Sequence, residues 1–120
     1  MRIISIFTHE PNDRPPTEAE MATMGKLIEE GMKAGWLIAT EGVHFAATGV
    51  RVHKSAGGKV TVTDGPFTET KEVIGGYALL KAGTRDEVVA LTRRFLDAVG
   101  QGTCELYQLY EMPAGEQVSR

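Results

Sequence analysis

Cysteine and long apolar runs are scarce in this chain, and each scarcity excludes a class of protein. The single cysteine, Cys104, cannot form an internal disulfide, which excludes a disulfide-stabilised secreted scaffold. No run approaches the roughly 20 apolar residues that a membrane helix requires. The N-terminus leads from Met1 and Arg2 into a predicted strand, without the apolar segment of a signal peptide. We therefore expect a cytoplasmic protein with no membrane partner.

Basic charge is also limited and scattered. The chain has 13 Lys and Arg against 16 Asp and Glu, a formal net charge of −3. A nucleic-acid-binding domain needs basic side chains gathered into a patch or stripe, and none is visible here. We expect no nucleic-acid partner.

The motifs that hold metals and cofactors are missing as well. There is no His-x-x-x-His spacing, no glycine loop of the phosphate-binding type, no Gly-x-Ser-x-Gly elbow and no nicotinamide fingerprint. Cys104 lies in a predicted strand and is interpreted as a packing residue. We expect neither a metal nor a cofactor.

What is present is enough for one small core. With 120 residues and 42% hydrophobic content, the chain is predicted to form a single domain over 1–120 that would gain from an oligomeric interface. The polar residues 113–120 are expected to fray.

Capping signals and periodicity predict the order of the elements. Thr17 and Glu20 form a capping box that opens a helix ending at Gly35, and Thr84 and Glu87 form a second box opening a helix that ends at Gly100. Strands are predicted over 2–8, 36–40, 77–81 and 104–112. The first helix is expected to bury one apolar stripe, made of Met21, Met24, Leu27, Ile28 and Met32.

Valines alternate with polar residues on both sides of Gly57-Gly58. Val50 and Val52 precede this pair, and Val60 and Val62 follow it. The pattern predicts a half-buried hairpin with its tip at the two glycines.

This order of elements predicts an α+β fold in which two helices cover one face of an antiparallel sheet and a hairpin is inserted between strands. The other face then carries apolar side chains that no helix covers. Since a monomer rarely exposes a large apolar patch, we expect a homodimer.

The densest stretch of the chain is 64–80. Asp64, Gly65 and Pro66 predict a rigid corner. Gly75-Gly76 predicts a bulge or a close backbone approach before the strand that begins at Tyr77.

Asp64-Gly65-Pro66-Phe67, followed by Glu69, Lys71-Glu72 and Gly75-Gly76-Tyr77, resembles the signature of DGPF-domain proteins, a branch of the YCII-related family. The resemblance covers essentially the whole chain. It implies a ferredoxin-like dimeric α+β barrel, and the site residues that it implies are Asp64, Phe67, Glu69, Lys71 and Tyr77, with Glu41 as a pocket carboxylate. The histidine that other YCII-related proteins carry on the first helix is absent.

Two residue types are candidates for proton transfer. Asp64 at its rigid corner is a candidate base, although a turn-shaping role explains it equally. His9 and His44 stand at predicted strand ends, where sites tend to be built, and each is a candidate partner for Asp64. Glu69 and Lys71 share a face of an extended segment, where they either clamp a ligand or pair with each other.

Two functions follow. The first is a cofactor-free lyase or isomerase acting on a small organic molecule in a cleft between sheet and hairpin, with Asp64 as base, Lys71 steadying negative charge, and Phe67 and Tyr77 as walls. The second is a non-catalytic dimeric ligand-binding or regulatory module, which the resemblance associates with sigma-factor signalling.

Overall fold

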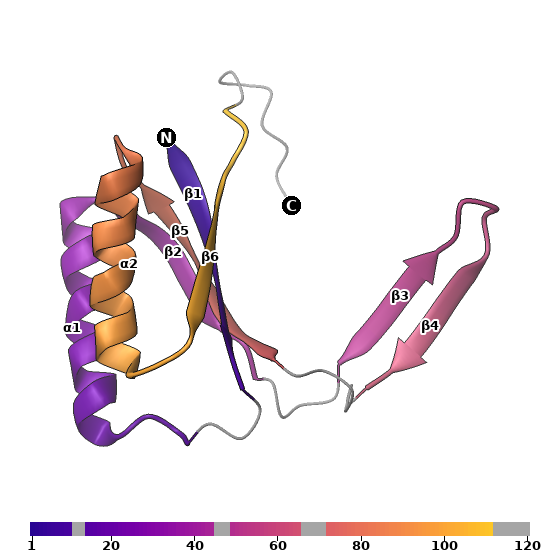
Figure 1. The fold of residues 1–120 in the computed structure, drawn as a ribbon, viewed down its shortest axis with the longest axis horizontal. Coiled ribbons are helices and arrows are strands. Elements are labelled where there is room, and N and C mark those ends of the chain that lie inside the picture. The colour runs from indigo at the N-terminus through magenta and orange to yellow at the C-terminus, as the bar shows by residue number, and fades with distance from the viewer. Residues whose placement is uncertain (11–13, 45–48, 66–71, 112–120) are drawn as a thin grey trace.

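The computed structural model describes residues 1–10, 14–44, 49–65 and 72–111, which form two helices and six strands (Figure 1). The elements in chain order are β1 (Arg2–His9), α1 (Glu18–Ala34), β2 (Leu37–Gly42), β3 (Val50–Lys54), β4 (Val60–Asp64), β5 (Val73–Lys81), α2 (Arg85–Val99) and β6 (Thr103–Gln108). The predicted mixed α+β class is confirmed.

Four strands form one antiparallel sheet in the order β2-β5-β1-β6. β1 is central, and Ile3 pairs with Leu80 of β5 on one side and Gln108 of β6 on the other. Both edges of β1 are therefore hydrogen-bonded, and its β-branched and aromatic residues point alternately to the two faces of the sheet.

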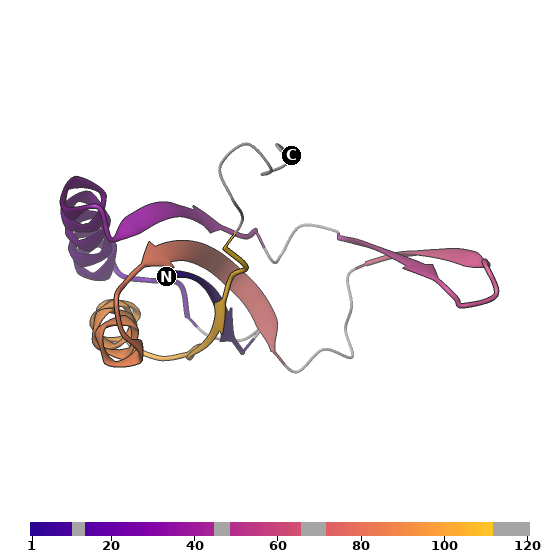
Figure 2. The same cartoon turned by 90° about the horizontal axis from the view of Figure 1, so that it is seen from above.

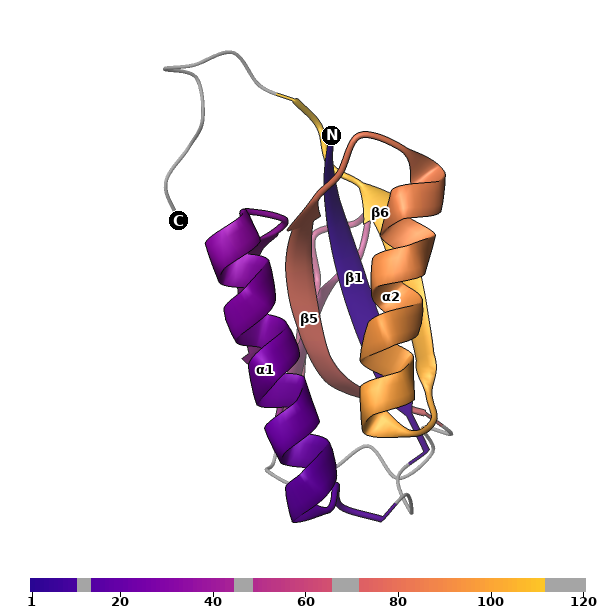
Figure 3. The same ribbon diagram turned by 90° about the vertical axis from the view of Figure 1, so that its left-hand side faces the viewer.

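Both helices lie side by side on one face of this sheet, α1 toward β5 and α2 toward β1 and β6 (Figures 2 and 3). Neither described helix covers the opposite face, which we call the far face. By register it carries Ile4, Ile6 and Thr8 of β1 and their partners on the neighbouring strands.

The ends of α1 follow from its sequence. The Thr17 hydroxyl accepts from the Glu20 N–H at 3.1 Å, and the Glu20 carboxylate accepts from the Thr17 N–H at 2.9 Å. At the other end Gly35 adopts φ 86°, a left-handed conformation that favours glycine. The predicted capping box and C-terminal cap are both confirmed.

The predicted burial of the α1 stripe is wrong at its two ends. Met21 is 60% exposed and Met32 is 46% exposed. Met24, Leu27 and Ile28 are half-buried and face the space between helix and sheet. Near the end of α1 the close contact is made at the buried Gly31, which lies against Trp36 and Leu37, so Met32 lies outside that contact.

The second capping box is only half formed. The Thr84 hydroxyl accepts from the Glu87 N–H at 3.2 Å, but the Glu87 carboxylate accepts from the Gly83 N–H at 3.0 Å rather than from Thr84. The extended backbone of Thr84, with φ −137°, brings the Gly83 amide within reach instead. α2 still begins and ends where its sequence predicts.

The hairpin forms with its predicted tip, but the prediction that it is half-buried is wrong. β3 and β4 pair in register with Val52 opposite Val62, and Gly58 adopts φ 95° in the turn. Every residue of both strands is exposed. The valines face no other described part of the chain, because the hairpin projects away from the sheet and helices (Figures 1 and 2).

Two strand boundaries also differ from the sequence pattern. β5 begins at Val73, four residues before Tyr77, so Gly75-Gly76 lies inside the strand. A register shift opposite Phe7 and Thr8 places a bulge there, as the glycine pair predicts. β6 ends at Gln108 although the alternation continues, because the Leu109 N–H still donates to the Arg2 carbonyl but the Arg2 N–H donates to the Glu111 carboxylate.

The tightly packed core occupies one end of the space between sheet and helices. Its buried members come from both layers: Ile3, Leu37, Leu80, Ala82 and Val88. Trp36 and Ile28 pack against them and are half-buried. Toward the end of β1 this core opens into a cavity.

Candidate functional site

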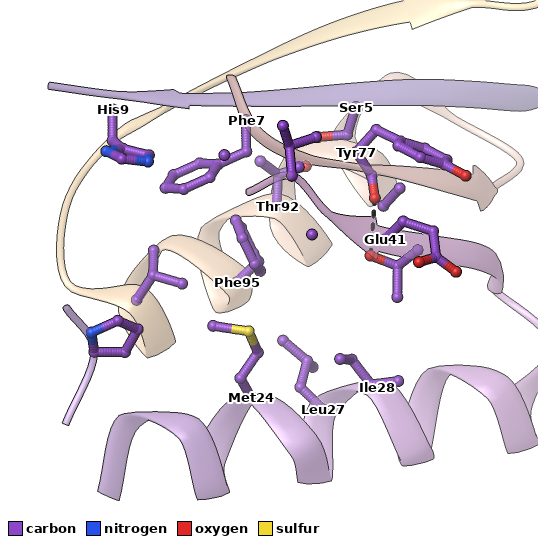
Figure 4. A pocket seen from close by; sticks show the side chains of 18 of the residues that line it. Ser5, Phe7, His9, Met24, Leu27, Ile28, Glu41, Tyr77, Thr92 and Phe95 are labelled. Carbon is purple, nitrogen blue, oxygen red and sulfur yellow. Dashed lines mark hydrogen bonds between the residues drawn. The ribbon is translucent and has the colours of Figure 1, made fainter. Parts of the chain in front are cut away.

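A cavity of about 860 Å³ lies between the sheet and the two helices (Figure 4). Its walls come from β1, β2 and β5 on the sheet and from α1 and α2 on the opposite side. It borders the core at Leu37 and Leu80 and extends to His9 at the end of β1. The cavity has the size of a small-molecule site.

The middle of the cavity is apolar. α1 contributes Met24, Leu27 and Ile28, and α2 contributes Leu91 and Phe95. Phe7 of β1 meets Phe95 edge-to-face, with ring centroids 5.2 Å apart. A ligand would therefore place apolar or aromatic atoms here.

Two hydroxyl groups of the cavity wall are hydrogen-bonded to the protein. The Thr92 hydroxyl donates to the Val88 carbonyl at 2.8 Å, and Ser5 forms a hydrogen bond with the Cys104 thiol. Burial raises the pKa of that thiol, with the hydrogen bond from Ser5 opposing the shift. Cys104 is thus held in its thiol form, consistent with its interpretation as a packing residue.

His9 stands at one end of the cavity. Its Nδ1 lies 2.8 Å from the Glu10 carbonyl oxygen, and its ring lies 5.7 Å from that of Phe7. Since a carbonyl oxygen only accepts, Nδ1 carries the proton, and in the neutral imidazole the lone pair is on Nε2. This fixed tautomer suits proton transfer.

Gly75 makes room for the His9 side chain. A Cβ built at Gly75 would lie 2.7 Å from a ring carbon of Phe7 and 2.8 Å from one of His9. Any other residue at this position would displace one of the two rings. The glycine pair therefore shapes the cavity as well as the strand.

Arg14 closes the same end together with Gln101. Its guanidinium donates two hydrogen bonds to Glu20, at 2.7 and 2.9 Å. The Arg14 guanidinium, with help from the Thr17 N–H, lowers the pKa of Glu20 to about 2. Because the paired charges cancel, this end does not select strongly for anions.

Glu41 and Tyr77 lie at the opposite end (Figure 4). They are cross-strand partners on β2 and β5. The neighbouring Thr40 hydroxyl donates to the Tyr77 carbonyl at 2.8 Å, which holds the two strands together at this point. By register the side chains of Glu41 and Tyr77 belong to the far face, so Thr40 supplies the polar side chain at this end of the cavity, with apolar walls between it and His9.

The structure brings three of the sequence-predicted site residues to this cavity, namely His9, Glu41 and Tyr77. Asp64 is exposed at the end of β4, and His44 is exposed just beyond β2. Neither lines the cavity. Phe67, Glu69 and Lys71 lie outside the described residues, as do Pro66 and the tail at 113–120.

The cavity residues that the sequence reasoning missed are mainly apolar: Phe7, Thr92 and Phe95, with Met24 and Leu27 of the first stripe. Their helical spacing marks them as inward-facing but does not distinguish a packed core from a cavity wall. The useful signal was Gly75, a small residue in a strand beside Phe7 and His9.

Within the described residues, no group of three or more His, Cys, Asp or Glu side chains is arranged to hold a metal ion. Neither described helix combines the length and apolar character needed to span a bilayer.

The model of the YCII-related domain matches residues 1–113, nearly the whole chain. The chain belongs to the YCII-related family. No curated protein matches this YCII-related chain. The match includes every strand and helix described above and both ends of the cavity, so the site is part of the YCII-related domain itself.

Proposed function

We propose that this YCII-related protein belongs to the DGPF branch and is a cofactor-free lyase or isomerase acting on a small organic molecule in the cavity. The observation that carries the proposal is the position of His9 at one polar end of a cavity whose middle is apolar. The Glu10 carbonyl fixes the tautomer of its imidazole. A single oriented imidazole is sufficient for general acid-base catalysis near neutral pH.

In this proposal His9 Nε2 takes a proton from a carbon of the bound molecule. The electron pair left on that carbon then forms a double bond. In an isomerase His9 returns the same proton to another carbon. In a lyase the electron pair expels a leaving group, and that group takes the proton from His9 as it departs. Neither course requires an oxidant or a reductant.

The cavity also indicates the kind of molecule. Its volume of about 860 Å³ is within the range of typical ligand pockets. Apolar walls favour an aromatic or aliphatic body, and the separation of His9 from Thr40 favours a polar group at each end. The neutralised Arg14–Glu20 pair favours an uncharged group beside His9.

The DGPF signature adds a second set of candidates. Asp64, Phe67, Glu69 and Lys71 are proposed as site residues on the resemblance alone, and His44 is proposed from its position just beyond a strand end. Since Asp64 is exposed on β4, its participation requires a ligand or a second subunit at the hairpin.

We further propose that 1–120 is one domain of a cytoplasmic homodimer with a ferredoxin-like dimeric barrel fold. The strand order β2-β5-β1-β6 supports the ferredoxin-like arrangement. The far face supports the dimer, because Ile74, Tyr77 and Tyr107 are exposed there beside the half-buried Ile4 and Ile6.

The experiment combines binding and turnover. Substituted benzenes with a polar group at each end would be screened by thermal shift, and those that bind would be followed for turnover by proton NMR.

The variant His9→Asn tests the proposed base. It keeps a donor for the Glu10 carbonyl but removes the basic Nε2 nitrogen. We expect it to lower kcat by about 100-fold or more with a small change in affinity. His53→Asn, on the exposed hairpin, is the matched control.

A blocking variant tests the location of the site. Leu27→Trp fills the cavity from α1 and should abolish binding, whereas Lys26→Trp, on the exposed side of the same turn, should not. Binding that survives Leu27→Trp would contradict the cavity as the site. Turnover that survives His9→Asn but not Asp64→Asn would transfer the role of base to the DGPF corner, and binding without any turnover would identify a non-catalytic module.

A further inference from the structure

The β3–β4 hairpin carries an apolar face that nothing in the described part of its own chain covers. Val52 and Val62 are cross-strand partners, and Val50 and Val60 extend the same face along the two strands, with Asp64 opposite Val50 and Lys54 opposite Val60 at its ends. These four residues, the valine face, are between 56% and 67% exposed. An isolated two-stranded hairpin is only marginally stable in water, so this hairpin needs a surface to pack against.

Its own sheet does not supply that surface. The hairpin extends away from β2 and β5 in two perpendicular views (Figures 1 and 2). Meanwhile the far face of the sheet exposes Ile74, Tyr77 and Tyr107. Two uncovered apolar surfaces that do not meet within one chain can meet between two copies of it.

Charge favours the same pairing. From Val50 to Asp64 the hairpin carries Arg51, Lys54 and Lys59 against Asp64 alone, a net charge of +2. Because the whole chain has a formal net charge of −3, the remainder carries −5. By register the far face carries Glu41 and Glu105 at the end near Tyr77 and Ile6, and Arg2 and Lys81 at the other end, so its acidic part is the Glu41–Glu105 end. A basic hairpin is therefore attracted to the acidic body of another copy.

The surface area that two such hairpins would bury is also large enough for a specific interface. The exposed parts of four valine side chains amount to roughly 250–350 Å² per hairpin, so two hairpins and the surfaces that receive them would bury about 1,000–1,400 Å². That is at the lower end of the range for a specific interface, and contact between the sheets themselves would add to it.

We infer that the β3–β4 hairpin is a dimerisation arm whose valine face packs on part of the far face of a second copy. The exchange is reciprocal, so each copy gives one arm and receives one. This inference rests on the proposed homodimer and identifies the element that holds it together.

Two neighbouring substitutions on β4 test the arm. Val62→Asp places a charge on the valine face, whereas Thr63→Asp places the same charge on the opposite face of the same exposed strand. By sedimentation velocity, we expect Val62→Asp to raise the dimer dissociation constant by about tenfold or more, and Thr63→Asp to change it by less than about threefold. Val62→Thr keeps the shape and β-branching and should give an intermediate effect if Val62→Asp folds poorly.

Cross-linking identifies the receiving surface. Val52→p-benzoylphenylalanine would be activated in a mixture of light and ¹⁵N-labelled protein, with the same probe at Thr63 as control. We expect mixed-isotope cross-links from position 52 to peptides of β1, β5 or β6.

The outcomes separate this inference from the dimer itself. A wild-type dimer whose dissociation constant is unchanged by Val62→Asp, or cross-links that stay within one copy, would overturn the arm and leave the dimer standing. A wild-type protein that is monomeric at about 100 µM would overturn both.

Discussion

At the residue scale, two glycines decide the shape of the site. A side chain at Gly75 would meet the rings of Phe7 and His9, and one at Gly76 would lie 2.7 Å from the Glu41 carbonyl oxygen. The first contact is with side chains that can rotate into the cavity, and the second is with the backbone of β2. The two positions should therefore respond differently to the same substitution.

We predict that Gly76→Ala destabilises the protein by about 3 kcal/mol, because β2 must separate from β5, and that Gly75→Ala costs only about 1 kcal/mol. Urea unfolding followed by the fluorescence of Trp36, the only tryptophan, measures both. Gly25→Ala is the control. Its new Cβ meets nothing within 4 Å on α1, so it should stabilise the protein by about 0.5–1 kcal/mol. Equal losses at Gly75 and Gly76 would contradict this account.

At the element scale, the start of α1 has an ion pair with Arg14 in addition to its capping box. Glu20 accepts from the Thr17 N–H and also from the Arg14 guanidinium, so one carboxylate ties the loop before the helix to its first turn. The same loop closes the His9 end of the cavity. The Arg14–Glu20 pair therefore links the N-terminal cap of α1 to the segment that closes the cavity.

This connection predicts a dependence of stability on pH. The pKa of Glu20 is lowered to about 2, from about 4.3 in an unfolded chain, so its contribution is fully present above the unfolded value and is lost as pH falls through about 2. Glu20→Gln keeps an acceptor for the Thr17 N–H but cannot titrate. Wild type should therefore be the more stable of the two at pH 6, and the difference should vanish toward pH 2. Urea unfolding across this range measures it.

Thr17→Ala provides the contrast at the same cap. It removes the hydroxyl that accepts from the Glu20 N–H and should cost about 1 kcal/mol at every pH. A Glu20→Gln difference that stayed constant down to pH 2 would contradict the assigned cause of the low pKa.

At the scale of the whole molecule, stability is unevenly distributed. The buried residues gather where β1 and β5 meet the helices, the cavity occupies the other end of the same layer, and the hairpin is exposed throughout. Local opening follows buried contacts, so these three regions should differ in amide protection.

We predict that amides of β1 and β5 exchange most slowly and those of β3 and β4 fastest when the protein is dilute. At concentrations that favour the dimer, amide exchange in the hairpin should become slower, whereas exchange in β1, which is already protected, should change little. Hydrogen exchange followed by mass spectrometry measures both. Hairpin amides as protected as those of β1 in dilute protein would contradict this distribution.

Much of the fold is predictable because its signals are local. The caps at Thr17, Gly35 and Thr84 each depend on a few adjacent residues, and the hairpin tip depends on Gly57-Gly58. The valine alternation located β3 and β4 correctly but predicted burial that is absent, since alternation shows which side chains share a face and not whether anything covers them.

By itself, the sequence determined the class of fold, the helix limits, the bulge at the glycine pair and membership of the YCII-related family. Only the tertiary structure decided that the helices stand apart from the sheet around a cavity, that His9 reaches it, and that Asp64 lies elsewhere on an exposed hairpin. The physical reason is the distance along the chain between the residues that interact. Caps and turns are set by bonds between near neighbours, whereas the spacing of layers is set by many weak contacts between residues far apart in the chain.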